Sequence, residues 1–258
     1  MNEKWAFVTG ACVNTGAAII EKFACEGVNA VFTGRNADKV KIAEENYRKK
    51  HPNVRIIGKT LNALDEHGQV DEECVKRVFA ELDDCGIIIT DLVLNAADLG
   101  VGFDALNSPL SDFQRVMNTN VLWNFCIIQH AAKRMTATGG SITFINSNTA
   151  YRAIPERAAY SASKGGQLGL MRALALDLGK YKIRVNAVLP GMIHTDRTDK
   201  NPEFYKTLPS AYSPLGSIAE GSDVADAVWY FVAHAKNTTG AELTVDCGNM
   251  IQLYPVIP

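Results

Sequence analysis

Short apolar segments alternate with longer helical patterns along most of the chain. The apolar segments are rich in Val, Ile, Phe and Leu without strict alternation, which is typical of parallel strands that are covered on both faces. The predicted strands are residues 5–9, 29–34, 54–58, 91–96, 141–146, 183–189 and 242–246. The predicted helices are residues 16–26, 36–50, 69–83, 110–135, 158–180 and 221–235. This alternation predicts an α/β fold, with a doubly wound, seven-stranded parallel sheet and helices on both of its faces.

Residues 195–216 interrupt the alternation. The segment is polar, contains three prolines and has no clear period. Long irregular segments in compact domains often serve function, and ligands bind beyond the carboxyl ends of strands in sheets of this kind. We therefore expect an irregular loop that acts as a substrate lid. No repeat or composition break divides the chain, so we expect one domain over residues 1–258.

The composition narrows the class of protein. The chain has 258 residues, a net charge of −2 and 47% hydrophobic residues, so we expect a globular protein with no general attraction to nucleic acid. No apolar run approaches the ~18 residues of a membrane span, and a strand begins too early to leave room for a signal peptide. Six cysteines are scattered without a CxxC pair, which suggests neither a disulfide framework nor a zinc site, and we expect no metal and a reducing cytoplasm.

A glycine loop follows the first predicted strand and opens the first helix. Gly10 and Gly16 lie where a pyrophosphate could meet backbone N–H groups and the positive end of a helix dipole. Asn14 stands where such loops usually have their middle glycine. Asparagine tolerates left-handed backbone geometry, so Asn14 can hold the shape of the loop. Whether it also contacts the ligand stays open.

A second signal is the sequence YSASK at residues 160–164. Tyr160 and Lys164 lie four residues apart, so they share one face of a helix. Ser147 ends the strand that precedes this helix, which can bring its hydroxyl to the tyrosine. Tyr–Lys pairs at this spacing are usually surface neighbours, and the context decides whether this pair is more than that.

Several segments in order resemble motifs of the short-chain dehydrogenase/reductase family. They are TGACVNTG at 9–16, LNAAD at 94–98, VMNTNVLWNF at 116–125, SITFINSNTA at 141–150, YSASK at 160–164, RVNAVLPGMIHT at 184–195 and TGAELTVDCG at 239–248. Nearly the whole chain is covered. The chain departs from the family at NAAD, which lacks the second asparagine and the glycine of NNAG, and at Cys247, where glycine is usual. The resemblance implies a three-layer Rossmann fold and an oxidoreductase that interconverts a ketone and a secondary alcohol.

The resemblance also implies a catalytic set of Asn120, Ser147, Tyr160 and Lys164. Tyr160 would exchange a proton with the substrate oxygen, and Ser147 would hydrogen-bond that oxygen. Lys164 would lower the tyrosine pKa by roughly 1–3 units through its charge, and would hold the nicotinamide ribose. Asn120 would hold a water that relays protons from Lys164.

The end of the second strand bears on the choice of cofactor. Gly34 occupies the position of the acidic residue that favours NAD in this family, and Arg35 follows it, where its guanidinium could pair with a 2′-phosphate. NADP(H) is therefore favoured, and NAD(H) stays open. The cofactor contacts implied by position are Gly10, Cys12, Asn14, Thr15, Gly16, Arg35, Asn62, Asn95, Ala96, Tyr160, Lys164, Pro190, Gly191, Ile193 and Thr195.

The sequence is least informative about the substrate. We expect a small carbonyl or alcohol compound in a partly apolar pocket, with candidate contacts at Asp98, Tyr151, Ile154, Met192, Tyr205 and Tyr212. Surplus apolar faces on residues 110–135 and 158–180 favour a homotetramer or homodimer. Two other functions stay open: a non-catalytic nucleotide sensor, and an epimerase or dehydratase of the same fold.

Overall fold

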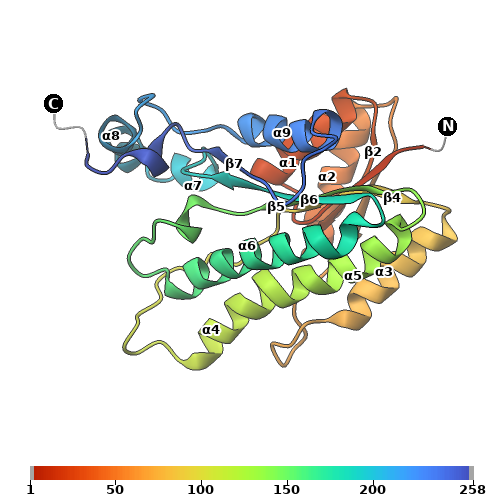
Figure 1. Cartoon of the computed structure of the whole chain (residues 1–258), viewed down its shortest axis with the longest axis horizontal. Helices are drawn as coiled ribbons and strands as arrows, with labels where there is room; N and C mark the ends of the chain where they lie inside the picture. The colour runs from red at the N-terminus through yellow and green to blue at the C-terminus, as the bar shows by residue number, and fades with distance from the viewer. Residues whose placement is uncertain (1–2, 256–258) are drawn as a thin grey trace.

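A parallel sheet forms the middle layer of the molecule (Figure 1). The computed structural model describes residues 3–255, except for the side chains of Arg197, Phe204, Tyr205, Leu208, Pro209 and Ser210. Within that range the sheet has seven strands in the order β3-β2-β1-β4-β5-β6-β7, all parallel. The strands are β1 (Trp5–Val8), β2 (Asn29–Gly34), β3 (Ile56–Thr60), β4 (Ile89–Leu94), β5 (Gly140–Ile145), β6 (Ile183–Pro190) and β7 (Glu242–Val245). The predicted doubly wound fold is confirmed.

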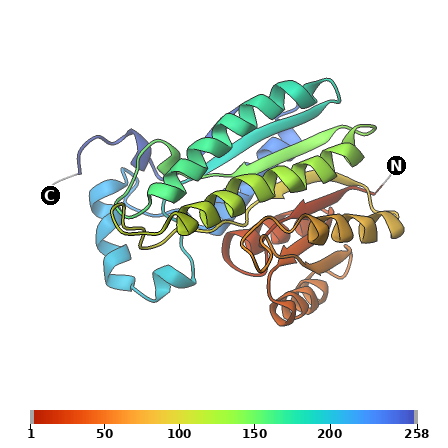
Figure 2. The ribbon, with the colours of Figure 1, turned by 90° about the horizontal axis from the view of Figure 1, so that it is seen from below.

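Helices cover both faces of this sheet. The upper layer in Figure 1 contains α1 (Asn14–Cys25), α2 (Ala37–Lys50) and α9 (Gly221–Trp229). The lower layer contains α3 (Glu72–Asp84), α4 (Leu110–Met117), α5 (Trp123–Met135) and α6 (Ala158–Gly179), and Figure 2 shows these helices from below. Each face of the sheet has its own buried apolar cluster. Phe7 stacks on Phe79 of α3 at 5.2 Å in one of them, and Phe32 meets Tyr47 of α2 edge to face at 5.2 Å in the other.

Local signals fix the ends of the first helices. The side chain of Asn36 accepts a hydrogen bond from Lys39 N at 2.9 Å, which caps α2 at the predicted start of the 36–50 helix. Gly27 follows the end of α1 with φ of +73°, a left-handed conformation that glycine adopts without strain. Both predicted ends are therefore confirmed.

Three predicted elements are corrected. The expected helix over 221–235 is α-helical only as far as Trp229, and Tyr230–His234 form a π-turn after it. The expected single helix over 110–135 contains a π-turn, Asn118–Leu122, which separates α4 from α5 and carries the buried Asn120. Such wide turns often accompany functional sites. The expected irregular lid instead forms two short helices, α7 (Asp196–Asp199) and α8 (Pro202–Tyr212). Thr195 and Thr198 form a capping box on α7, and a proline at the first position of α8 suits a helix start.

A buried carboxyl group gives the fold a pH dependence. Asp91 in β4 is 7% exposed, and burial raises its pKa to about 6 although Thr90 donates a hydrogen bond to it at 2.8 Å. The unfolded chain ionises this group near its ordinary pKa of about 3.9, so this contribution to stability falls as the pH rises from about 4 to about 6.

We expect Asp91→Asn to stabilise the protein at neutral pH. Asparagine removes the cost of burying the charge, on the order of 3 kcal/mol, and its side-chain oxygen can still accept from Thr90. Thermal unfolding of both proteins across this pH range measures the effect. The gain should shrink as the pH falls toward about 4, and a gain that does not depend on pH would contradict the assignment.

Candidate active site

The glycine loop packs against the neighbouring strand end too closely for side chains. Gly10 has φ of +66°, and a Cβ on it would lie 2.8 Å from Cβ of Ala96. A Cβ on Gly16 would lie 2.5 Å from the carbonyl oxygen of Gly10 and 2.7 Å from Nδ2 of Asn95. Contacts this short exclude any larger residue. The loop therefore brings Gly10, Gly16, Asn95 and Ala96 together at the carboxyl edge of the sheet.

Thr9 joins the ends of β1 and β4. Its Oγ1 accepts hydrogen bonds from the backbone N–H groups of Asn95 at 2.9 Å and Ala96 at 3.0 Å. The side chain of Asn95 in turn donates to the carbonyl oxygens of Thr9 and Gly10 at 3.1 and 2.9 Å. Sequence reasoning did not single out Thr9. A signal was present, because Thr9 opens the TGACVNTG segment that resembles the family's glycine loop.

The start of α1 fits a nucleotide pyrophosphate. Its N-cap residue, Val13, makes no side-chain capping hydrogen bond, and the first turn carries no acidic residue. Helix starts leave several backbone N–H groups without partners inside the helix, and these favour an anion. Together with the side-chain-free approach at Gly10 and Gly16, these residues are suited to holding the dinucleotide that the fold implies.

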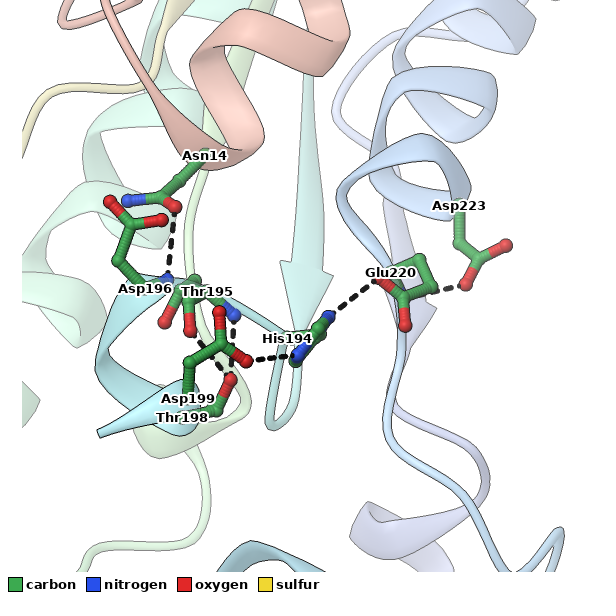
Figure 3. A network of polar contacts seen from close by, with 8 residues as sticks. All are labelled: Asn14, His194, Thr195, Asp196, Thr198, Asp199, Glu220 and Asp223. Atoms are coloured by element: carbon green, nitrogen blue, oxygen red, sulfur yellow. Dashed lines mark hydrogen bonds and ion pairs between the residues drawn. The ribbon is translucent and has the colours of Figure 1, made fainter. Parts of the chain in front are cut away.

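Asn14 has a second role besides the turn. Its φ of +54° confirms that it takes the left-handed geometry expected of this position. Its side-chain Oδ1 also accepts a hydrogen bond from the backbone N–H of Asp196 at 3.2 Å (Figure 3). Asn14 therefore ties the glycine loop to the first lid helix, 182 residues further along the chain.

Gly34 and Cys12 are matched at the end of β2. A Cβ on Gly34 would collide with Sγ of Cys12, so the sulfur occupies the space that a larger residue at position 34 would need. The next residue, Arg35, is exposed, and Lys39 is exposed one helical turn later. Asn62, another predicted cofactor contact, is exposed beyond β3. This corner thus offers exposed cationic side chains and no acidic one at position 34.

Lys164 is the most deeply buried charged group of the site. It is 2% exposed, and its Nζ donates to the carbonyl oxygen of Ile145 at 2.8 Å and to Oε1 of Gln167 at 3.3 Å. Burial lowers the pKa of this amine to about 7. The amine thus takes up and releases a proton near neutral pH. Its Nζ lies 5.5 Å from the ring centroid of Tyr160.

The pKa of Tyr160 differs from the expectation. Burial raises it, and the hydrogen bond with Ser147 and the charge of Arg157 only oppose that rise. The expected lowering by Lys164 does not dominate, because that amine is itself buried with a depressed pKa. Ser147 and Tyr160 are nevertheless brought together as predicted. The phenol is therefore held in its protonated form at neutral pH.

Asn120 is fully buried in the π-turn and faces α6. Its Nδ2 donates to Ser163 Oγ and to the carbonyl oxygen of Asp98, both at 2.9 Å. The backbone carbonyl oxygen of Asn120 accepts a hydrogen bond from Nε2 of Gln167 at 2.7 Å. Because Gln167 also accepts from Lys164, a hydrogen-bonded chain joins Asn120 to the lysine.

Three supporting residues were missed in the sequence. Asn146 donates to the carbonyl oxygen of Lys164 at 2.9 Å and to Gln167 at 3.1 Å. Ser163 and Gln167 share the buried face of α6 with the lysine. Gln167 follows Lys164 by three residues and Ser163 by four. This spacing was a usable signal, since polar groups on a buried helix face need partners.

The segment after β6 supports the lid. A Cβ on Gly191 would lie 2.6 Å from Cβ of Asp246, so the chain passes close to the end of β7 beyond Pro190. Ile193 pairs with Ala219 in an isolated bridge, and Thr195 caps α7. The predicted nicotinamide contacts thus lie on one continuous segment at the carboxyl edge.

The predicted substrate contacts are placed unevenly. Asp98 accepts from Gly100 N at 2.9 Å and pairs with Arg115, so its carboxylate is already engaged. Tyr151 donates to Glu242 at 2.7 Å. Tyr212 is 41% exposed and offers its carbonyl oxygen to Asn249 at 2.9 Å.

Ile154 lines an open cavity of about 530 Å³ beside the start of α6. The cavity is also bordered by Phe103 and Ala105, which give it an apolar wall. Met192 is half-buried beside the lid. The side chain of Tyr205 lies outside the described part of the structure.

His194 joins the lid to the start of α9. Its Nε2 lies 2.7 Å from Oδ1 of Asp199, and its Nδ1 lies 3.2 Å from Oε2 of Glu220 (Figure 3). Both carboxylates favour the charged imidazolium, and the pKa of His194 is raised, first by the Asp199 hydrogen bond and then by the charge of Glu220. Glu220 is itself fixed by its capping box with Asp223.

The all-parallel sheet and the side-chain-free glycine loop define the Rossmann class of nucleotide-binding folds, and Tyr160 and Lys164 lie close together beside them. A family model described as enoyl-(acyl carrier protein) reductase matches residues 10–249. The chain is 31% identical to a 3alpha-hydroxysteroid dehydrogenase of Mediterraneibacter gnavus, over 95% of this chain and 96% of that one. It is 30% identical to a 3-oxoacyl-(acyl-carrier-protein) reductase of Aquifex aeolicus, over 95% and 96%.

Solved structures agree with these relatives. The acetoin dehydrogenase of Salmonella typhimurium superposes with a TM-score of 0.83 at 25% identity, over 96% of this chain and 98% of that one. The chain belongs to the short-chain dehydrogenase/reductase family, whose members act on alcohol or ketone substrates with a nicotinamide cofactor. Among residues 3–255, none of the helices is both long and apolar enough to cross a membrane.

We expect the His194 contact to hold α7 more firmly at low pH. The imidazolium pairs with both carboxylates below its unfolded pKa of about 6.5, and the contribution is lost as the pH rises through the raised folded value. Hydrogen exchange at the amides of Thr198 and Asp199, compared between wild type and His194→Gln, measures this.

The difference between the two proteins should be large at acidic pH and should shrink at alkaline pH. His67→Gln is the matched control, because His67 is exposed and far from the lid in sequence. A difference in exchange that stays constant with pH would contradict the role given to the contacts of His194 with Asp199 and Glu220.

Proposed function

We propose that the chain is a single-domain NADP(H)-dependent reductase of ketones and dehydrogenase of secondary alcohols. The observation that carries this proposal is the arrangement of buried Ser147 and Lys164 around the half-buried Tyr160, with Asn120 linked to the lysine through Gln167. A nicotinamide bound at the glycine loop would supply or accept the hydride at the substrate carbon. Proton chemistry at the substrate oxygen is left to the chain's own side chains.

Tyr160 is assigned the role of general acid in the reductive direction. Its raised pKa keeps the phenol protonated near neutral pH, so a proton is available for the substrate oxygen. Ser147 would hydrogen-bond the same oxygen and stabilise the negative charge that develops on it. In the oxidative direction the same phenol must first lose its proton, so alkaline conditions favour that direction.

Lys164 is assigned the role of proton relay. Its pKa of about 7 allows it to return a proton to the tyrosine near neutrality. Gln167 would position the relay, because its Oε1 accepts from the lysine and its Nε2 donates to the backbone carbonyl oxygen of Asn120. Protons would reach Lys164 from solvent through a water held at Asn120.

Arg35 is assigned to the 2′-phosphate of NADP(H). The collision of any Cβ at Gly34 with Cys12 keeps an acidic side chain out of the adjacent position. An exposed guanidinium next to that position can pair with a phosphate through two N–H groups. The choice between NADP(H) and NAD(H) in this chain is a matter for the kinetic test of Arg35 below.

A homotetramer or homodimer in the cytoplasm completes the proposal. Leu122 and Phe125 in the π-turn and α5, and Leu176 in α6, are large apolar side chains that are 52%, 37% and 84% exposed. Faces of this kind suit burial in a second copy of the chain. The substrate would be a small carbonyl or alcohol compound.

We expect Tyr160→Phe to lower kcat at least about a hundredfold, because the variant lacks the acidic proton. Cofactor affinity should not change, since the ring remains in place. The test is a panel of ketones and alcohols with each nicotinamide cofactor, followed by absorbance, together with a binding titration of NADPH. Tyr181→Phe, on an exposed tyrosine after α6, is the matched control. Near-normal turnover by Tyr160→Phe would refute the mechanism, and cofactor binding without turnover in the wild type would favour a sensor.

We expect Arg35→Gln to lower kcat/KM for NADPH by roughly tenfold or more, because a charge-assisted hydrogen bond is worth about 1.5–3 kcal/mol. The value for NADH should change little. Lys41→Gln on the exposed face of α2 serves as control. Steady-state kinetics with both cofactors measures the effect, and a wild-type preference for NADH would overturn the assignment.

A further inference from the structure

Three metal-ligating side chains meet between α3 and α5, outside the site described above. Glu72 begins α3, and Cys126 and His130 lie on α5. One potential ligand atom from each lies within 4.8 Å of the other two. The two helices pack against each other along this line, as Figure 2 shows from below.

The spacing on α5 suits a shared ligand. Cys126 and His130 are four residues apart, so their side chains project from the same face of the helix. This face turns toward α3, where the His130 ring stacks on Phe79 with centroids 5.6 Å apart. The first turn of α3, which carries Glu72, lies opposite them and is capped by Asp71, whose side chain accepts from Cys74 N at 2.9 Å.

The three ligand atoms have no competing partner. Within residues 3–255, no hydrogen bond or ion pair of the Glu72 carboxylate, the Cys126 sulfur or the His130 ring nitrogens is found. Cys126 is 7% exposed, His130 is half-buried and Glu72 is exposed. The cluster therefore has a buried soft donor, a nitrogen donor and an outer carboxylate that solvent can reach.

Cationic side chains surround the cluster. Arg134, Lys133 and Lys76 lie close enough to act on the His130 ring, and their charges partly offset those of the thiolate and carboxylate. Because the thiolate is the form that binds a metal ion, the ion must displace the thiol proton of Cys126.

We propose that Glu72, Cys126 and His130 form a three-ligand site for a zinc-class divalent cation. Sulfur, nitrogen and oxygen ligands in one set suit zinc and its spectroscopic substitute cobalt, with water in the fourth position. Binding forms one bond to each side chain, displaces metal-bound water and releases the Cys126 proton to solvent. Zinc bond lengths place tetrahedral ligand atoms roughly 3–4 Å apart, so a side-chain movement of about 1 Å closes the site.

The consequence of binding would be mechanical. The ion would clamp the first turn of α3 to the middle of α5, and it would stabilise the folded state by preferring it over the unfolded chain. Helix α5 continues directly from the π-turn that carries Asn120. Because α5 follows this π-turn directly, the bound ion would also restrict the movement of the turn.

Titration with Co²⁺ alone tests the site without any turnover assay. We expect one equivalent to bind, with a thiolate-to-cobalt charge-transfer band. The band should disappear in Cys126→Ser. In His130→Gln and Glu72→Gln the affinity should fall at least about tenfold, since even the loss of an outer-shell partner costs that much. Zn²⁺ should raise the Tm of the wild type and should not raise that of Cys126→Ser.

The controls are Cys85→Ser and His67→Gln, which remove an exposed cysteine and an exposed histidine elsewhere and should bind like the wild type. Thermal unfolding with a chelator shows whether the buried Cys126→Ser still folds, and the two surface variants test the site if it does not. Absence of saturable binding, or equal binding by all variants, would overturn the proposal. Neither result would bear on the catalytic assignment.

Discussion

The burial of the Lys164 amine constrains the elements packed around it, which are the end of β5, the π-turn of Asn120 and α6. An ammonium group removed from water must find hydrogen-bond acceptors or lose its charge. Lys164 does both in part, with acceptors at Ile145 and Gln167 and a pKa lowered to about 7. The same polar network fixes Asn146 and the π-turn of Asn120. The end of β5, the π-turn and α6 are therefore held together through the hydrogen bonds of this one side chain and its partners.

The region around the glycine loop depends on the close approach of backbone segments to one another. Gly10 and Gly16 let β1, β4 and the start of α1 meet without side chains between them. The side chains of Thr9 and Asn95 make hydrogen bonds to backbone N–H and carbonyl groups where these segments meet. Asn14 extends the same loop to the lid, where His194 and its two carboxylates form the other attachment. The glycine loop and the segment from His194 to Asp199 are thus joined by hydrogen bonds.

Much of the fold could be read from local pattern. Buried parallel strands are continuous apolar runs, so all of the predicted strands were found within about two residues of their positions. The caps at Asn36 and Gly27 were visible because capping depends on single residues. The lid helices were missed, because prolines and polar residues mask short helices whose start depends on the Thr195–Thr198 box. The π-turn was missed because one inserted residue leaves the helical pattern almost unchanged.

The sequence by itself determined the sheet, the glycine loop and the order of Ser147, Tyr160 and Lys164, because these depend on neighbours or on fixed spacing along the chain. Tertiary structure alone decided the contacts between distant segments. Among them are Asn14 with Asp196, and Glu72 with Cys126 and His130. It also decided the pKa directions of Tyr160 and Lys164, since these follow from desolvation. Burial depends on everything packed around a group, and no local pattern contains that information.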